Sequence, residues 1–172
     1  MLARNNIRQW LAQGSSGVLT VWALTAAFST YFCMYAFRKP FAVGTFEGVA
    51  VLPGLPEMDL KILYIIVQVI GYASSKFLGI KVVSELPSAK RAKTIGVFIG
   101  IAWFSLLLFA VLPAPWAALA LLLNGLPLGM IWGFVFGFLE GRKVSDLLGA
   151  GLCASFIVAS GFVKSVGKWV MG

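Results

Sequence analysis

The chain has 172 residues, of which 60% are hydrophobic and only 12% are charged, and its mean hydropathy is +0.93. A soluble domain carries about 25% charged residues, which its water-facing surface needs. The composition therefore excludes soluble enzymes, nucleic-acid-binding domains and disordered chains. The net charge of +8 has another use in a membrane protein, because Lys and Arg in short loops set its orientation. We predict a protein whose main solvent is the lipid bilayer.

The residue types that most enzymes need are scarce. The sequence has no His and only six acidic residues, which excludes an imidazole base, a His-ligated metal and a Ser–His triad. Cys33 and Cys153 both lie in apolar runs, and we interpret them as small buried hydrophobic residues rather than a disulfide. We predict that the protein is not an enzyme and that it holds neither a metal nor a cofactor.

Five apolar segments are long enough to cross the hydrocarbon core, which takes about 20 residues of helix. The uncharged stretch between residues 94 and 139 is too long for one span, and Pro113 and Pro115 divide it. The predicted spans are approximately residues 17–38, 62–83, 94–112, 116–139 and 146–165. The pattern predicts an all-α, polytopic transmembrane helix bundle that forms a single domain over residues 1–172.

The basic residues favour one orientation of these spans. A cytoplasmic N-terminus places eight Lys and Arg on the cytoplasmic side and five on the other, as the positive-inside rule requires. The eight are Arg4, Arg8, Lys81, Lys90, Arg91, Lys93, Arg142 and Lys143. We therefore predict a multi-pass protein of the inner (cytoplasmic) membrane with its N-terminus in the cytoplasm.

Glycine recurs at every fourth position of the fourth span, and the spacing appears once more in the third. These residues are Gly125, Gly129, Gly133, Gly137 and Gly141, with Gly96 and Gly100 in the third span. A stripe without side chains lets a neighbouring helix backbone approach closely. Two interpretations stay open: tight structural packing, and a smooth surface along which helices slide during a transport cycle.

Polar side chains form two stripes inside the spans, because residues three or four apart share a helix face. The first span carries Tyr31, Tyr35 and Arg38, followed by Lys39; the second carries Gln68, Tyr72 and Lys76; and Asn124 stands in the fourth. A simpler interpretation is available for each group. Arg38 and Lys39 would be interfacial anchors beside an aromatic belt, and Lys76 would extend its stem along the lipid to reach the headgroups.

An ionisable residue at membrane depth costs several kcal/mol and usually faces a cavity or a pathway. Both stripes combine Tyr with a cation, and no Asp or Glu lies inside the membrane to pair with these cations. A bound anion would match them, since Arg offers a planar fork, Lys a point charge, and the Tyr hydroxyls further donors. The sequence therefore suggests a pathway for an anionic solute.

At these residues the chain resembles the N-terminal half of a major facilitator superfamily transporter, and in particular the organophosphate:phosphate antiporter branch. The run from Tyr31 to Phe41 is similar to that branch's first-helix motif, and the run from Gly71 to Gly79 is similar to its second-helix motif. The superfamily's signature loop after the second helix is poorly kept, because its Asp–Arg pair is missing and Glu85 stands nearby.

The resemblance implies that Arg38 is the phosphate-binding residue and that Tyr31, Tyr35, Tyr72 and Lys76 line the translocation path. It also implies a central position for Arg38, whereas hydropathy places this residue near the outer end of the first span. The resemblance and the odd number of spans predict a fragment of a longer transporter. Its partners would be the missing C-terminal half, the lipid bilayer and a small anionic solute, with no nucleic acid.

We expect a secondary active transporter that carries a small organic anion, with a phosphorylated one favoured, by alternating access. Arg38 would be the main anion ligand, supported by Lys39 and Lys76. The tyrosines would form hydrogen-bonding walls, and Gln68 and Asn124 would assist. The alternative is a membrane anchor or sensor that binds an anionic ligand at the same residues without transporting it.

Overall fold

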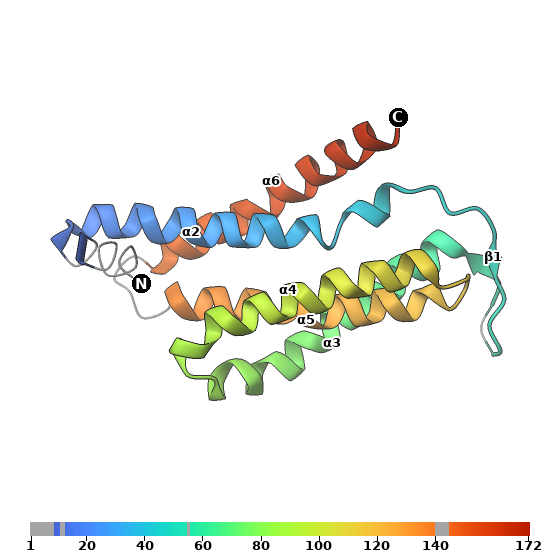
Figure 1. The fold of residues 1–172 in the computed structure, drawn as a ribbon, viewed down its shortest axis with the longest axis horizontal. Coiled ribbons are helices and arrows are strands. Elements are labelled where there is room, and N and C mark those ends of the chain that lie inside the picture. The colour runs from blue at the N-terminus through green and yellow to red at the C-terminus, as the bar shows by residue number, and fades with distance from the viewer. Residues whose placement is uncertain (1–8, 11–12, 55, 140–144) are drawn as a thin grey trace.

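A computed structural model describes residues 9–10, 13–54, 56–139 and 145–172 (Figure 1). It confirms an all-helical architecture with five helices that are long and apolar enough to cross a membrane. These helices fit a multi-pass membrane protein. Gly141 of the glycine series and the orienting residues Arg4, Arg8, Arg142 and Lys143 lie outside the described residues.

Five long helices and three short elements make up the described chain. In order they are α2 (Ser16–Ala36), η1 (Pro40–Val43), β1 (Val49–Ala50), β2 (Met58–Asp59), α3 (Leu60–Glu85), α4 (Ser88–Val111), α5 (Ala117–Leu139) and α6 (Ser145–Met171). The Ser15 hydroxyl caps the start of α2 by accepting a hydrogen bond from the Val18 amide. Pro113 and Pro115 separate α4 from α5. The antiparallel pair β1–β2 was not predicted, because two residues carry no periodic signal.

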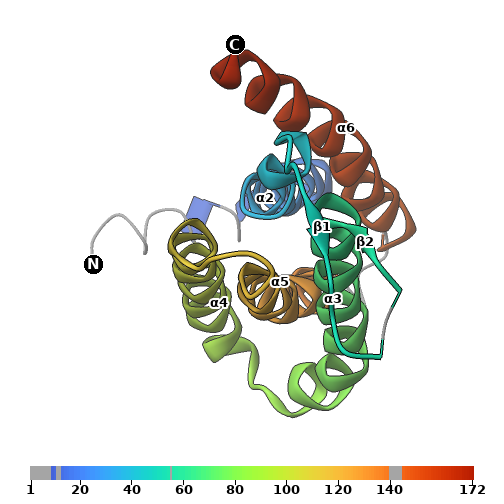
Figure 2. The ribbon, with the colours of Figure 1, turned by 90° about the vertical axis from the view of Figure 1, so that its right-hand side faces the viewer.

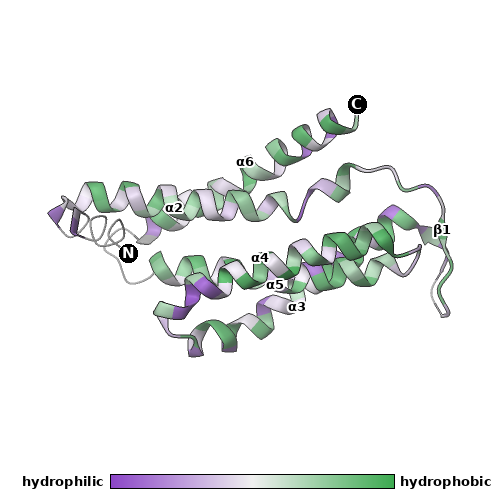
Figure 3. Cartoon of the chain, in the orientation of Figure 1, coloured by the Kyte–Doolittle hydropathy of each residue, from purple (hydrophilic) through white to green (hydrophobic). Residues whose placement is uncertain are grey.

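The helices form two groups, one of α3, α4 and α5 and the other of α2 and α6 (Figure 2). Helix α5 is central and the most buried of the five. Hydrophilic residues gather near the α3–α4 connection, whereas most residues along the helices are hydrophobic (Figure 3). This distribution is the one that a bilayer requires of a helix bundle.

The glycine series of α5 is the seam along which α5 packs on α3. A Cβ atom at Gly125 would lie 2.5 Å from the Gln68 carbonyl oxygen and 2.8 Å from the Tyr72 amide nitrogen. A Cβ at Gly129 would collide with the Ser75 hydroxyl. Gly125 and Gly129 therefore bring the backbones of α5 and α3 into contact, which is the structural interpretation of the motif.

The two glycines of α4 behave differently from those of α5. A Cβ atom at Gly96 or Gly100 would meet no atom of the described chain within 4 Å. Both glycines face outward, so the expected close approach of a neighbouring helix does not occur there. The same four-residue spacing thus supports packing only where tertiary structure supplies a partner.

Helix α2 is shifted along the bundle axis relative to α3, α4 and α5 (Figure 1). Trp22, in the second turn of α2, shares a pocket with Ala92 near the start of α4 and Leu139 at the end of α5. The other end of α2 therefore stops inside the bundle. The Gln68 side chain bonds the Arg38 carbonyl, which places the end of α2 about 12 Å along α3 from its first residue at 1.5 Å per residue.

Proline explains why α2 ends where it does. Pro40 has no amide hydrogen to continue the helical hydrogen bonds beyond Lys39, whose amide still bonds the Tyr35 carbonyl at 3.0 Å. The chain then forms η1 and an extended segment toward β1 (Figure 1). Arg38 thus follows the end of a helix and still lies inside the bundle. Hydropathy alone had placed this residue at an outer end, because hydropathy does not report an axial shift.

An aromatic cluster holds the segment that follows the break. Phe46 contacts Tyr64 of α3 and Phe109 of α4 edge to face, with ring centroids 5.1 and 5.7 Å away. Phe41 of η1 also meets Phe109, at 6.2 Å. Non-helical backbone at membrane depth is tolerated where protein covers it, and these rings supply that cover.

The expectation that both cysteines are buried is wrong. Cys33 of α2 and Cys153 of α6 are free, as expected, but both side chains are exposed on the protein surface. An apolar stretch of sequence indicates an apolar environment, and for a spanning helix that environment is lipid as readily as the protein interior.

Substituting one glycine of α5 and one glycine of α4 tests the α3–α5 seam. We expect Gly125→Ala to lower the free energy of unfolding by about 1–3 kcal/mol, because its methyl group meets backbone atoms that cannot move aside. The matched control is Gly96→Ala, which should be neutral or stabilising by up to about 1 kcal/mol through helix propensity. Thermal unfolding of the detergent-solubilised protein measures both, and equal melting temperatures for the two variants would refute the seam.

Candidate functional site

Arg38 occupies the centre of the predicted site. Its guanidinium carbon lies 3.7 Å from the centroid of the Tyr72 ring and 5.8 Å from that of Tyr35. The first distance places the guanidinium against the ring face, a favourable cation–π arrangement. Tyr72 stands at the middle of the 26-residue α3, so the positive charge lies near the middle of that helix.

One nitrogen of Arg38 has no hydrogen-bond partner. Its Nε is buried and unpaired within the described residues. A buried donor without a partner costs about 1–3 kcal/mol, and a guanidinium donates readily to carboxylate or phosphate oxygens. Arg38 is thus held by stacking while at least one of its donors is left unused.

Tyrosine hydroxyls join the two predicted stripes. The Tyr31 and Tyr72 hydroxyl oxygens are 3.0 Å apart and share a hydrogen bond between α2 and α3. Tyr35 lies one turn from Tyr31 on α2, with the two rings edge to face at 5.6 Å. Tyr31 and Tyr35 are buried. The structure therefore brings together the three tyrosines and Arg38, which the sequence placed on two separate helices.

Gln68 and Asn124 form a buried network beneath Arg38. The Gln68 Nε2 donates to the Asn124 Oδ1 at 2.9 Å and to the Arg38 carbonyl at 3.0 Å. The Asn124 Nδ2 donates to the carbonyls of Phe37 at 3.2 Å and Ala102 at 3.0 Å. The last carbonyls of a helix have no partner within it, and these amides supply partners at the end of α2.

This network gives Gln68 and Asn124 a different position from the one the sequence suggested. Both amide groups bond to each other and to backbone carbonyls, so their donors point at protein rather than into an open site. They hold the backbone at Phe37 and Arg38 in place. Sequence periodicity places each residue on a helix face but does not reveal which carbonyls it meets.

Lys39 lies in a positively charged environment. Burial and the positive charges of Arg38 and Lys164 together lower the pKa of the Lys39 ammonium. Each of these effects disfavours the charged form. The two charged groups that act on Lys39 are both cations. A negative ligand would favour the charged form and relieve the repulsion.

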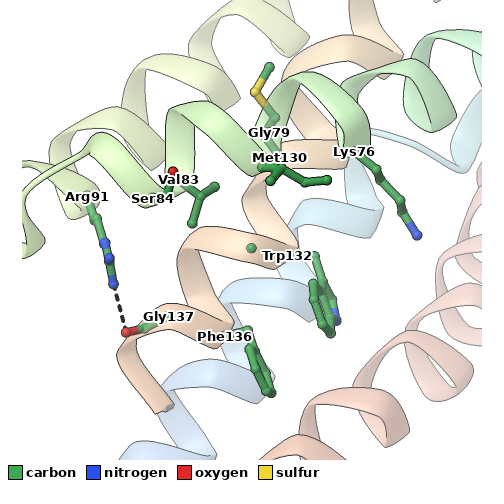
Figure 4. A pocket seen from close by; sticks show the side chains of 12 residues that line it. Lys76, Gly79, Val83, Ser84, Arg91, Met130, Trp132, Phe136 and Gly137 are labelled. Carbon is green, nitrogen blue, oxygen red and sulfur yellow. Dashed lines mark hydrogen bonds between the residues drawn. The ribbon is translucent and has the colours of Figure 1, made fainter. Parts of the chain in front are cut away.

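Lys76 lies at the edge of the site rather than at its centre. Its ammonium is exposed and stands 5.1 Å from the centroid of the Tyr72 ring. The same side chain lines a pocket of about 530 Å³ between α3 and α5 (Figure 4). The Tyr72 ring therefore has two cations near it, Arg38 against its face and Lys76 farther off.

Arg91 lies at the far end of this pocket and has a structural role. Its Nη1 donates to the Gly137 carbonyl at 2.7 Å, the bond drawn in Figure 4, and its Nε donates to the Leu86 carbonyl at 3.4 Å. A cation bonded to the last carbonyls of a helix is a common C-terminal cap. Arg91 thus ties the start of α4 to the end of α5.

These residues form a site suited to binding an anion. Stacked guanidinium, neighbouring ammonium groups and phenolic hydroxyls all donate hydrogen bonds or positive charge. Sequence reasoning missed Lys164, which it counted only among the five cations on the side opposite the cytoplasm. The sequence gives no signal for its proximity to Lys39, because the pairing of α6 with α2 is a tertiary feature.

Comparison with known proteins gives one match. A model of a family of unknown function, DUF5690, matches residues 40–172. No curated protein and no solved structure matches the chain. The matched range contains Gln68, Tyr72, Lys76 and Asn124, and it begins directly after Arg38 and Lys39.

A substitution at Asn124 tests the network at the end of α2. We expect Asn124→Leu to leave the Phe37 carbonyl and one donor of Gln68 unpaired, at about 1–3 kcal/mol for each buried group. The melting temperature of the solubilised protein should fall clearly. Ser105→Ala is the control, because Ser105 is equally buried but bonds only within its own helix. A loss no greater than that of the control would mean that the network does not hold α2.

Proposed function

This chain belongs to the DUF5690 family, and from the geometry of its site we propose that it is a secondary active transporter of a small organic anion. A phosphorylated solute suits the site best, because several cationic and hydroxyl donors surround one position. Transport proceeds by alternating access. The proposal includes no chemical step on the solute.

The observation that carries the proposal is the position of Arg38. Its guanidinium stacks on Tyr72 at the middle of α3, and its Nε is buried with no hydrogen-bond partner among the residues that the structure describes. An interfacial anchor would extend toward the headgroups, where water solvates its charge. A cation directed into the bundle is costly unless a ligand or cavity compensates it. A bound anion supplies that compensation.

The interrupted helix also supports a transport role. Substrate sites of secondary transporters lie near the bilayer midplane and are commonly built on discontinuous helices. Helix α2 ends beside the site, with η1 following after a short break. The two motifs that resemble the organophosphate:phosphate antiporter branch meet through Tyr31, Tyr72 and Arg38. We therefore also propose a major-facilitator-type bundle.

The distribution of charge supports the proposed orientation. The start of α2, the α3–α4 connection and the end of α5 lie at one end of the bundle (Figure 1). That end carries Lys81, Lys90, Arg91 and Lys93. We place it in the cytoplasm, following the positive-inside rule, and we place the protein in the inner membrane.

Flux measurements separate transport from the rival function. The full-length protein is reconstituted in liposomes preloaded with inorganic phosphate or a sugar phosphate, and uptake of the same labelled anion is followed. We expect saturable exchange that protein-free liposomes lack. Binding of the anion to the solubilised protein without any exchange would instead identify a sensor or anchor.

Arg38→Lys tests the central residue of the site. The variant keeps the positive charge but loses the planar fork and the stacking on Tyr72. We expect binding of inorganic phosphate, measured by calorimetry, to weaken about 10- to 100-fold, since hydrogen bonds to charged groups contribute about 1.5–3 kcal/mol. Arg91→Lys makes the same chemical change at the α5 cap and should bind normally. Full affinity in Arg38→Lys would overturn the assignment.

A further inference from the structure

Helices α2 and α6 lie side by side and run in the same direction (Figures 1 and 2). The ring centroids of Tyr31 on α2 and Phe156 on α6 are 6.3 Å apart. Farther along, a Cβ atom at Gly167 of α6 would be in van der Waals contact with Val43 of η1. The sequence separation between the two partners is nearly the same in both pairs. The alignment of α6 with α2 therefore continues past the end of α2.

This register places Lys164 beside the site. Phe156, Ser160 and Lys164 are each four residues apart and lie on neighbouring turns of one helix face. Tyr31 and Lys39 are separated by the same length of chain as Phe156 and Lys164. Lys164 is therefore level with Lys39, which agrees with the electrostatic effect of Lys164 on Lys39.

Lys39 thus lies near two other cations, Arg38 beside it in the chain and Lys164 at the same level of α6. Arg38 and Lys39 follow α2, and Lys164 projects from α6. Like charges held together are unfavourable unless a counter-charge is present. A singly charged anion compensates one of the three charges, whereas a phosphate monoester carries about two negative charges near neutral pH and several acceptor oxygens.

We propose that Lys164 is a third cationic ligand of the anion held by Arg38 and Lys39, and that it makes the site selective for doubly charged anions over singly charged ones. The proposal rests on the proposed anion site and adds α6 to it. The anion bridges the two elements, with Arg38 supplying hydrogen-bond geometry and the two ammonium groups supplying charge.

A matched pair of lysine variants tests this role. Lys164→Gln removes the proposed ligand, and Lys168→Gln removes an equally exposed lysine one turn farther along α6. Binding of a sugar phosphate and of acetate to each full-length variant is measured by calorimetry at fixed ionic strength. Both side chains are exposed, so both variants should keep the melting temperature of the wild type.

We expect Lys164→Gln to weaken binding of the sugar phosphate about tenfold, the size of one charge-assisted contact. Its effect on acetate should be much smaller, Lys168→Gln should change neither affinity by more than about twofold, and Lys164→Arg should restore sugar-phosphate binding. Equal losses in the Lys164 and Lys168 variants would overturn the proposal, because they would indicate only long-range charge.

Comparing Lys164→Gln with Arg38→Lys distinguishes an error about Lys164 from an error about the whole anion site. If Lys164→Gln binds the sugar phosphate normally while Arg38→Lys does not, the site stands and Lys164 is not part of it. If neither substitution affects binding, both the proposed site and the role of Lys164 are wrong.

Discussion

A helix that ends inside a bilayer leaves carbonyl groups that water cannot solvate, and each such group costs several kcal/mol if it stays unpaired. Helix α2 ends inside the helix bundle, and the carbonyls of Phe37 and Arg38 accept hydrogen bonds from the side-chain amides of Asn124 and Gln68. The site depends on this arrangement. Because α2 stops there, Arg38 leaves the helix at a depth where its guanidinium reaches Tyr72.

The two helix groups contribute different things to the site. The glycine seam packs α5 tightly on α3, and these helices carry the amides and the Tyr72 ring that fix the position of Arg38. Arg38 and Lys39 follow the end of α2, and Lys164 belongs to α6. A close-packed frame on one side and charged residues on the other suit a transporter, in which one group of helices moves against another around a bound solute.

Much of the fold could be predicted because a helix that crosses the bilayer must be apolar along most of its length. The five spanning helices and the division near Pro113 follow from that rule. The axial shift of α2 could not be predicted, since it depends on which residues of α4 and α5 meet Trp22. The length of α6 was also missed. The helix continues to Met171, whereas the predicted span ends near residue 165. A charged residue such as Lys168 lowers the hydropathy of the segment but does not interrupt the backbone hydrogen bonds of the helix.

The site was predictable in its chemistry but not in its connections. Helical periodicity placed Tyr31 and Arg38 on one stripe and Tyr72 on another, and the structure joins these stripes through a tyrosine pair and a stacked guanidinium. It also shows what Asn124 does, because the carbonyl partners of a buried amide are set by packing rather than by spacing. Lys164 was overlooked for the same reason: its neighbour Lys39 is close only in three dimensions.

The most direct test of this account is the depth at which α2 ends in the bilayer. Nitroxide labels at Ala36, the last residue of α2, and at Val111, the last residue of α4, are compared in reconstituted protein lacking Cys33 and Cys153. Both side chains are exposed, so the labels should not disturb packing. From collision with oxygen and a water-soluble relaxant, we expect the Ala36 label to lie roughly 10 Å deeper than the Val111 label, given a rise of 1.5 Å per residue. Equal depths would mean that α2 ends at the membrane surface and that Arg38 is an interfacial anchor.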